Sequence, residues 1–192
     1  MRESNIKRTT GETSVNVTIN LDEATAPSID TGIPFFDHML TLMAFHGQFS
    51  LDIEAEGDLK VDSHHTIEDI AITLGSALKE ALGSKKGIRR YATVFLPMDE
   101  SLARVVIDLS NRPTLVMNFD YKRESIGGMA LENVREFFKA FTDNARLTLH
   151  ADVLYGDNDH HKVEALFKGL GRALSEAFSV NGRTLPSTKG TL

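Results

Sequence analysis

A cluster of two histidines and a glutamate occurs twice in this chain. The first copy runs from His64 to Glu68, and the second runs from His160 to Glu164, 96 positions later. The apolar residues that follow each copy keep this offset and recur every three or four positions, as in a helix with one buried face. Gly75 and Gly171 match at the same offset. The sequence therefore predicts two related helices, each beginning with His-His-x-x-x-Glu.

The spacing of this cluster predicts a metal site. Residues three and four apart share a face of a helix, so Glu68 lies one turn on from His64 and His65. Adjacent residues diverge by about 100° around the axis, so the two histidines would not easily bind the same ion. We expect each helix to serve two ions, and imidazole with carboxylate suits Mn, Fe, Zn, Co or Ni better than Mg or Ca. A single pair would be more simply explained as surface histidines, but two copies favour metal binding.

Composition narrows the class of protein. The chain has 192 residues, of which 41% are hydrophobic and 25% charged, as in a soluble globular protein of one or two small domains. The net charge of −6 disfavours a nucleic-acid partner. We find no membrane-spanning run and no signal-peptide pattern. The chain has no cysteine, which excludes disulfides and cysteine-based zinc sites and fits the cytoplasmic location that we expect.

The two halves of the chain carry similar patterns. Alternating apolar residues predict strands at 15–21 and 103–109, which follow Glu12 and Glu100 at an offset of 88. Helices are expected at 34–46 and 131–141, with further strands at 51–55, 91–98, 114–119 and 147–151. We predict an α+β fold of two tandem half-domain repeats, residues 1–92 and 93–192, that pack helices against helices.

The remaining histidines and several basic residues are further site candidates. His38 and His46 lie on the 34–46 helix, where Asp37 could orient His38, and His150 lies on the polar face of a strand. A histidine on an apolar helix is often a core residue, so the role of His46 stays open. Arginine, lysine and serine side chains that suit a phosphate are Arg90, Arg112, Lys168, Ser187 and Lys189. Their spacing alone is more typical of solvated surface residues.

Several stretches together resemble the imidazoleglycerol-phosphate dehydratases of histidine biosynthesis. They are Arg8-x-Thr10-x-Glu12-Thr13, Thr31 to Leu40, His64 to Asp69, Gly87 to Tyr91, Pro97 to Glu100, Arg112-Pro113, Leu149-His150, His160 to Glu164 and Pro186 to Gly190. They extend over nearly the whole chain, and as a set they are highly specific. Ala71 and Asn111 depart from the pattern, since glycine is expected at both positions, but neither is a proposed ligand.

The resemblance implies an architecture and a set of site residues. Four helices would be sandwiched between two mostly antiparallel β-sheets, in a 24-subunit shell with active sites at subunit interfaces. Glu12 and His46 would be catalytic residues that contact the substrate, and the five basic and serine residues named above would bind its phosphate. Two Mn²⁺ ions per site would be bound by His38, His64, His65, Glu68, His150, His160, His161 and Glu164. How these ligands divide between the ions stays open.

The implied reaction is that of a hydro-lyase, which dehydrates D-erythro-imidazoleglycerol phosphate to imidazoleacetol phosphate in L-histidine biosynthesis. Two metal ions on the ring nitrogens would favour the imidazolate, which can expel the hydroxyl on the adjacent carbon. Glu12 is the expected acid/base, and the phosphate site would orient the substrate.

Two other functions fit parts of the pattern. A dinuclear metallohydrolase of small phosphoesters could use the same ligands with a metal-bound hydroxide. A metal-storage protein could also carry helical glutamates and histidines, but di-iron bundles use Glu-x-x-His on long helices, and here the order is reversed.

Overall fold

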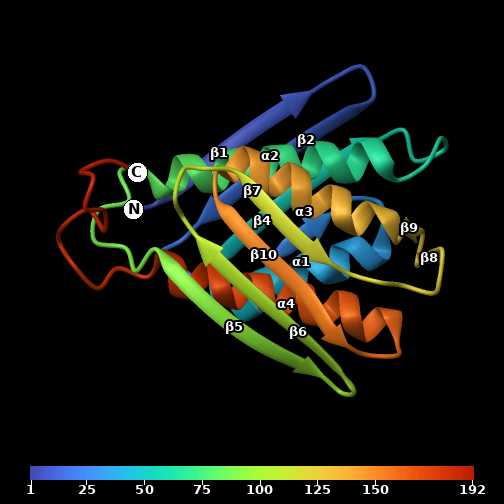
Figure 1. Ribbon diagram of the computed structural model, residues 1–192. Coiled ribbons are helices and arrows are strands. Elements are labelled where there is room, and N and C mark those ends of the chain that lie inside the picture. Colours follow the sequence, from blue (N-terminus) through green and yellow to red (C-terminus); the bar gives the residue numbers. More distant parts are fainter.

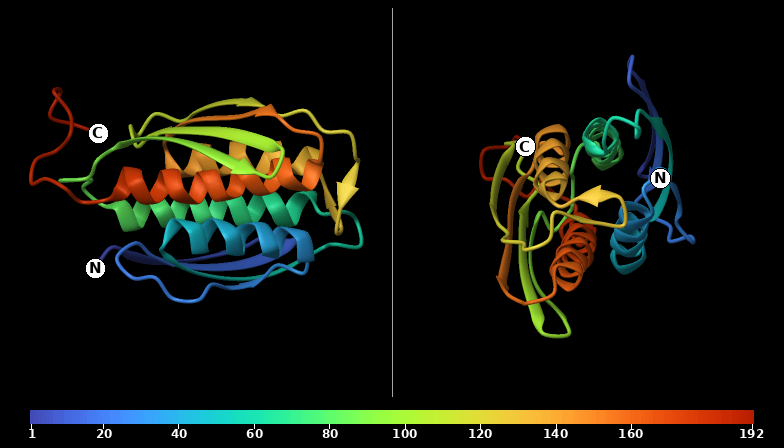
Figure 2. Two further views of the ribbon diagram at one scale, coloured as in Figure 1. Left: turned by 90° about the horizontal axis from the view of Figure 1, so that it is seen from below. Right: turned by 90° about the vertical axis from the view of Figure 1, so that its right-hand side faces the viewer.

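The computed structural model describes residues 1–192 and shows two four-stranded sheets with four helices between them (Figures 1 and 2). The elements of the first half are β1 (Glu3–Thr9), β2 (Thr13–Asn20), β3 (Ser28–Asp30), α1 (Pro34–Gly47), β4 (Ser50–Gly57) and α2 (His64–Leu82). Those of the second half are β5 (Tyr91–Met98), β6 (Ser101–Asp108), β7 (Thr114–Asn118), β8 (Ser125–Ile126), β9 (Met129–Ala130), α3 (Glu132–Ala145), β10 (Thr148–Tyr155) and α4 (Asp159–Phe178).

The two sheets have the same topology. Their strand orders are β1-β2-β4-β3 and β5-β6-β10-β7, with one parallel pair in each sheet, β3 with β4 and β7 with β10. Side chains of one face line up across the strands, because successive residues of a strand point to opposite faces. One such row joins Ile6, Val17, Ile53 and Ile29, and its counterpart joins Val94, Val105, Ala151 and Met117. These apolar rows belong to the core that the helices cover.

The helices of the two halves pack against each other. Helix α2 contacts α3, and α1 contacts α4, so each helix pair joins the first half to the second. Aromatic rings connect the helices further, since Phe137 of α3 lies 5.4 Å from Phe36 of α1 and 5.0 Å from Phe167 of α4, measured between ring centroids. The halves therefore share one hydrophobic core.

Both helices that carry the duplicated cluster begin within one residue of their first histidine. The side chain of Asp62 accepts a hydrogen bond from the backbone N–H of His64 at 2.8 Å, and Asn158 does the same for His160 at 2.9 Å. Such acceptors satisfy N–H groups that the first turn of a helix leaves free. Each histidine pair therefore lies in the first turn of its helix, at the same end of the molecule (Figure 2).

The duplicated glycines allow the helix pairs to approach closely. A Cβ atom on Gly171 of α4 would lie 2.0 Å from the backbone oxygen of Met43 in α1. A Cβ atom on Gly75 of α2 would lie 2.7 Å from the backbone oxygen of Phe141 in α3. Any larger residue at either position would push two backbones apart.

The structure confirms the α+β class and the sandwich of four helices between two mostly antiparallel sheets. The edge strands β1 and β3 and the short β8–β9 hairpin were not predicted from the sequence, and α3 and β10 extend about four residues further than predicted. The expected boundary between residues 92 and 93 falls inside β5, and the segment that connects α2 to β5 is 83–90. No helix is both long enough and apolar enough to span a bilayer.

The close approach at Gly171 can be tested with Gly171→Ala. The added methyl group would meet the backbone of α1, so we expect the free energy of unfolding to fall by roughly 1–3 kcal/mol. Chemical denaturation at fixed protein concentration measures the change. The control is Gly182→Ala, whose Cβ would have its nearest neighbour 3.8 Å away. Equal stability of the two variants would show that the helices separate at no cost.

Candidate active site

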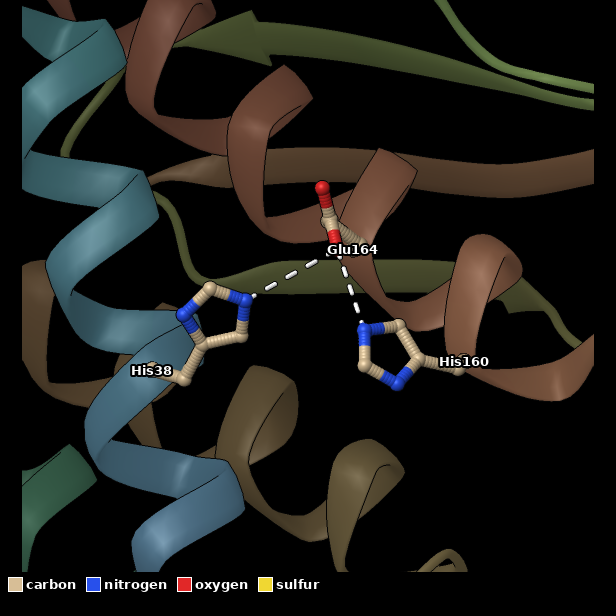
Figure 3. A group of neighbouring side chains, drawn as sticks. All are labelled: His38, His160 and Glu164. Carbon is tan, nitrogen blue, oxygen red and sulfur yellow. Dashed lines mark hydrogen bonds and ion pairs between the residues drawn. The ribbon is translucent and has the colours of Figure 1, made fainter.

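One cluster of candidate ligands lies between α1 and α4. His38 comes from α1, while His160 and Glu164 come from the first two turns of α4 (Figure 3). The Oε2 atom of Glu164 is 3.1 Å from Nε2 of His160 and 3.8 Å from Nε2 of His38. The possible ligand atoms of all three residues lie within 4.8 Å of one another. Two imidazole nitrogens and one carboxylate oxygen therefore converge, as they would around a transition-metal ion.

The carboxylate of Glu164 is held in its ionised form. Burial raises the pKa of this group, but Lys168, which forms an ion pair with it one turn further along α4, and His160 lower the pKa by more. The net pKa of Glu164 is below its ordinary value, so the group is a charged ligand. Lys168 thus lies beside the candidate metal ligands, with its Nζ 3.6 Å from the sulfur of Met98.

A second cluster lies at the start of α2. Glu12 comes from the turn between β1 and β2, Asp58 follows β4, and His65 is in the first turn of α2. The Nδ1 atom of His65 is 3.0 Å from Oδ2 of Asp58 and 3.6 Å from Oε2 of Glu12. The hydrogen bond to Asp58 is the main cause of a raised pKa of His65. The expected acid/base Glu12 and an expected ligand are therefore neighbours.

The repeat of this arrangement lies at the start of α4. The Nδ1 atom of His161 is 2.7 Å from Oε2 of Glu100, and this hydrogen bond holds the pKa of Glu100 far below its usual range and raises the pKa of His161. Oε1 of Glu100 accepts hydrogen bonds from the backbone N–H groups of Asp157 and Asn158. No role was predicted for Glu100 from the sequence, although its offset of 88 positions from Glu12 indicated that the two residues are equivalent.

The other candidate ligands are not gathered in the same way. His64 contacts Asn133 of α3 at 3.1 Å, and Glu68 is half-buried one turn further along α2. His150 is exposed on β10, opposite Val106 of β6 and Val116 of β7. From there the strand continues for five residues, or about 17 Å, before it reaches the loop to α4. A single chain therefore does not bring the eight candidate ligands to one point.

Asp37 does not orient His38, so that part of the sequence analysis was wrong. Oδ1 of Asp37 accepts hydrogen bonds from the backbone N–H and the hydroxyl of Thr31. Asp37 lies in the first turn of α1, and these contacts hold the preceding loop against that turn. A polar residue next to a histidine in sequence points to another side of the helix, which explains the error.

Four of the five phosphate candidates line one pocket near the chain terminus. Arg90, Arg112, Ser187 and Lys189 surround a space of about 630 Å³, and Lys168 is absent from its lining. Arg90 is buried and bound to Asp108 through two nitrogens, at 2.7 and 3.2 Å, and its Nη1 donates to the backbone oxygen of Pro186 at 2.8 Å. Arg90 thus fastens the tail, whereas the side chain of Arg112 is 64% exposed.

His46 belongs to a different groove. With Arg172, Thr93 and other residues it lines a space of about 680 Å³ beside α4 and β5. Burial lowers the pKa of His46, and the positive charges of Lys168 and Arg172 lower it further. His46 is therefore a neutral imidazole near neutral pH.

The metal-ligand candidates and the terminal pocket lie at opposite ends of α4. The backbone N–H of Arg90 donates to the oxygen of Ala177 in the last turn of α4, while His160 is in the first turn. At 1.5 Å per residue this separation is about 26 Å. Figure 1 shows the red C-terminal tail on the side of the molecule away from the start of α4. A small ligand cannot contact both regions of one chain.

Known proteins resemble this chain over its full length. A family model described as imidazoleglycerol-phosphate dehydratase matches residues 31–174. Relatives with this name from Clostridioides difficile strain 630 and Clostridium botulinum strain Langeland are 50% and 55% identical, with 100% of each chain covered. The crystal structure of this dehydratase from Staphylococcus aureus N315 has a TM-score of 0.85 and 44% identity, and it covers 93% of this chain and 99% of its own. The Pyrococcus furiosus structure has a TM-score of 0.84 and 39% identity, with coverage of 97% and 100%.

The role of Arg90 as an anchor of the tail can be tested with Arg90→Lys. Lysine keeps the charge but cannot bind Asp108 through two nitrogens and also reach Pro186. We expect amide hydrogen exchange in residues 185–192 to become faster, on the order of tenfold, as measured by mass spectrometry. Arg89→Lys is the matched control, because Arg89 pairs with Glu176 instead. Equal exchange in both variants would contradict the role.

Proposed function

Because the chain belongs to the imidazoleglycerol-phosphate dehydratase family, we propose that it converts D-erythro-imidazoleglycerol phosphate to imidazoleacetol phosphate at a dimanganese site, in the cytoplasm. As a member of this family it is a hydro-lyase of histidine biosynthesis. The observation that supports the proposal most is the convergence of His38, His160 and Glu164 in a chain that resembles these enzymes over its whole length. The alternative, a dinuclear metallohydrolase of small phosphoesters, would not require a substrate that contains an imidazole ring.

The side chains at the two helix starts fit a transition-metal ion. Imidazole nitrogens and ionised carboxylates are suitable ligands for Mn²⁺ and related ions. The proposed ligands are His38, His64, His65, Glu68, His150, His160, His161 and Glu164. Bound to an imidazole ring, such ions would lower the pKa of its N–H group.

Glu12 is the proposed acid/base. Its side chain is 56% exposed and lies in a turn, 3.6 Å from His65, so it is both next to the proposed metal ligands and free to reach a substrate. In this role Glu12 takes the proton from the carbon next to the one that loses its hydroxyl, and the resulting enol becomes the ketone. His46, with its lowered pKa, would meet the substrate as a neutral hydrogen-bonding group.

We further propose that each active site is shared between subunits of a 24-subunit shell. The separation of about 26 Å between the start and the end of α4 supports this, since imidazoleglycerol phosphate is much shorter. A substrate could then bind its ring at the helix starts of one subunit and its phosphate in the terminal pocket of a neighbour. Lys168, which pairs with Glu164, would contribute to the phosphate site from the metal side.

The reaction and the role of Glu12 can be tested together. We expect wild-type protein with Mn²⁺ and imidazoleglycerol phosphate to form the enolised ketone product, followed by its absorbance. Glu12→Gln removes the proton-transfer group, so its turnover should fall by roughly 10²–10⁴-fold while Mn²⁺ binding and particle size stay unchanged.

Glu3→Gln is the matched control, because Glu3 is an exposed residue on β1 away from the cluster. Near-normal turnover in Glu12→Gln would remove Glu12 from the mechanism. Wild-type protein that hydrolyses a panel of phosphoesters but leaves imidazoleglycerol phosphate intact would replace the proposal with the metallohydrolase.

The sharing of sites between subunits predicts complementation. Glu164→Gln damages the metal cluster, and Arg112→Ala damages the terminal pocket, so each homogeneous variant should be nearly inactive. Co-expressed in equal amounts, the two chains should form mixed particles in which about a quarter of the sites combine an intact cluster with an intact pocket. Activity near this level supports shared sites, and a mixture as inactive as its components would show that both regions act within one chain.

A further inference from the structure

Three of the proposed ligand histidines share one hydrogen-bonding arrangement. The Nδ1 atom of each faces a side-chain oxygen: Asn133 Oδ1 for His64 at 3.1 Å, Asp58 Oδ2 for His65 at 3.0 Å, and Glu100 Oε2 for His161 at 2.7 Å. The three oxygens come from α3, from the loop after β4 and from the β5–β6 turn. Unrelated segments therefore supply the same contact to the same ring atom.

This contact selects the tautomer of a neutral histidine. A neutral imidazole carries one N–H, and an oxygen acceptor at Nδ1 places it there, which leaves the lone pair on Nε2. The carboxylates of Asp58 and Glu100 can only accept. The amide of Asn133 is oriented as well, because its Nδ2 donates to the hydroxyl of Ser63 at 3.1 Å and its side chain is buried. In all three rings Nε2 is therefore the atom available to a metal ion.

Glu100 is the most firmly held of the three acceptors. Its Oε1 accepts from the backbone N–H groups of Asp157 and Asn158 at 3.0 and 2.8 Å and from the hydroxyl of Ser101 at 3.0 Å. These donors fix the carboxylate plane, and Oε2 is left to face His161. The first two donors belong to the loop that leads into α4, so the same carboxylate also connects the β5–β6 turn to the start of that helix.

The duplicated glutamates have diverged in role. Glu12 occupies the matching turn of the first half, but it is 3.6 Å from Nδ1 of His65, and Asp58 makes the closer contact there. The exposed fraction of the side chain is 56% for Glu12 and 39% for Glu100. One copy is therefore free for chemistry, while the other is occupied by four hydrogen bonds.

We propose that Glu100, together with Asp58 and Asn133, is a positioning residue that fixes a ligand histidine as the Nδ1–H tautomer and presents its Nε2 to the metal ion. This rests on the proposed function for the identity of the ligands. Acceptors behind metal-binding histidines contribute about 10–100-fold to metal affinity when they are lost. The proposal gives Glu100 no direct contact with the substrate.

The test uses Glu100→Gln, which keeps the shape of the side chain. The amide oxygen would have to accept from the two backbone N–H groups, so the amide NH₂ would face Nδ1 of His161 and force the proton onto Nε2. Solid-state ¹⁵N NMR of histidine-labelled, metal-free assembled protein, at alkaline pH where the histidines are neutral, should show one histidine changing from the Nδ1–H to the Nε2–H tautomer. Titration with Mn²⁺ alone, followed by the EPR signal of the free ion, should show affinity weakened about 10–100-fold.

Two further variants keep the result decisive. Asp58→Leu removes the oxygen that Nδ1 of His65 faces, so it should weaken Mn²⁺ affinity about 10–100-fold, and the proposal does not depend on the folding of one variant. Glu80→Gln is the control, because Glu80 is exposed near the end of α2 and should change neither measurement.

Each outcome has a defined meaning. An unchanged tautomer in Glu100→Gln, or unchanged Mn²⁺ affinity in both Glu100→Gln and Asp58→Leu, would overturn the positioning role. Wild-type protein that binds no Mn²⁺ would instead contradict the proposed metal site. The NMR spectrum of the metal-free protein distinguishes failure of the metal site from failure of the positioning role, because it reports the tautomer without any metal ion.

Discussion

The close packing of helices from opposite halves is the contact on which the rest of the structure depends. His38 reaches His160 and Glu164 only because α1 lies against α4, and Asn133 reaches His64 only because α3 lies against α2. Glycines at matching positions of α2 and α4 make both approaches possible. The hydrophobic core and the candidate metal ligands are therefore products of the same interface, and a chain that lost the contact between its halves would lose both.

Duplication supplied two equivalent scaffolds, and single residues made them different. In each half, the turn between the first two strands of the sheet places a glutamate near the second histidine of the pair. Glu12 is 3.6 Å from its histidine and largely exposed, whereas Glu100 accepts four hydrogen bonds. Asp58 takes over the orienting contact in the first half. Lys168 adds a further difference, since its positive charge keeps Glu164 ionised despite burial. A symmetric fold thus carries an asymmetric set of functional groups.

The length of α4 determines how far apart the candidate metal ligands and the terminal pocket lie in one chain. A helix of 20 residues separates the candidate metal ligands from the pocket that holds Arg112, Ser187 and Lys189. His150 lies apart from both helix starts, on the exposed face of β10. The proposed assembly would bring these separated parts of different subunits together into one site.

The amino-acid sequence alone determined the local elements and the chemical type of the site. Periodic apolar residues predicted all four helices and the central strands, because burial of one face imposes a period on the chain. The sequence did not predict β1 or β3. These edge strands have few apolar residues and form by pairing with β2 and β4. Lys168 and Glu164 are four positions apart, a spacing that is typical of an ion pair on one helix face, so their pairing was predictable from the sequence. Only the tertiary structure decided that Asp37 contacts Thr31, that Arg90 fastens the tail, and that Glu100 and Asn133 face histidines. Hydrogen bonds are directional and short, so such partners depend on how distant segments pack, which no local pattern encodes.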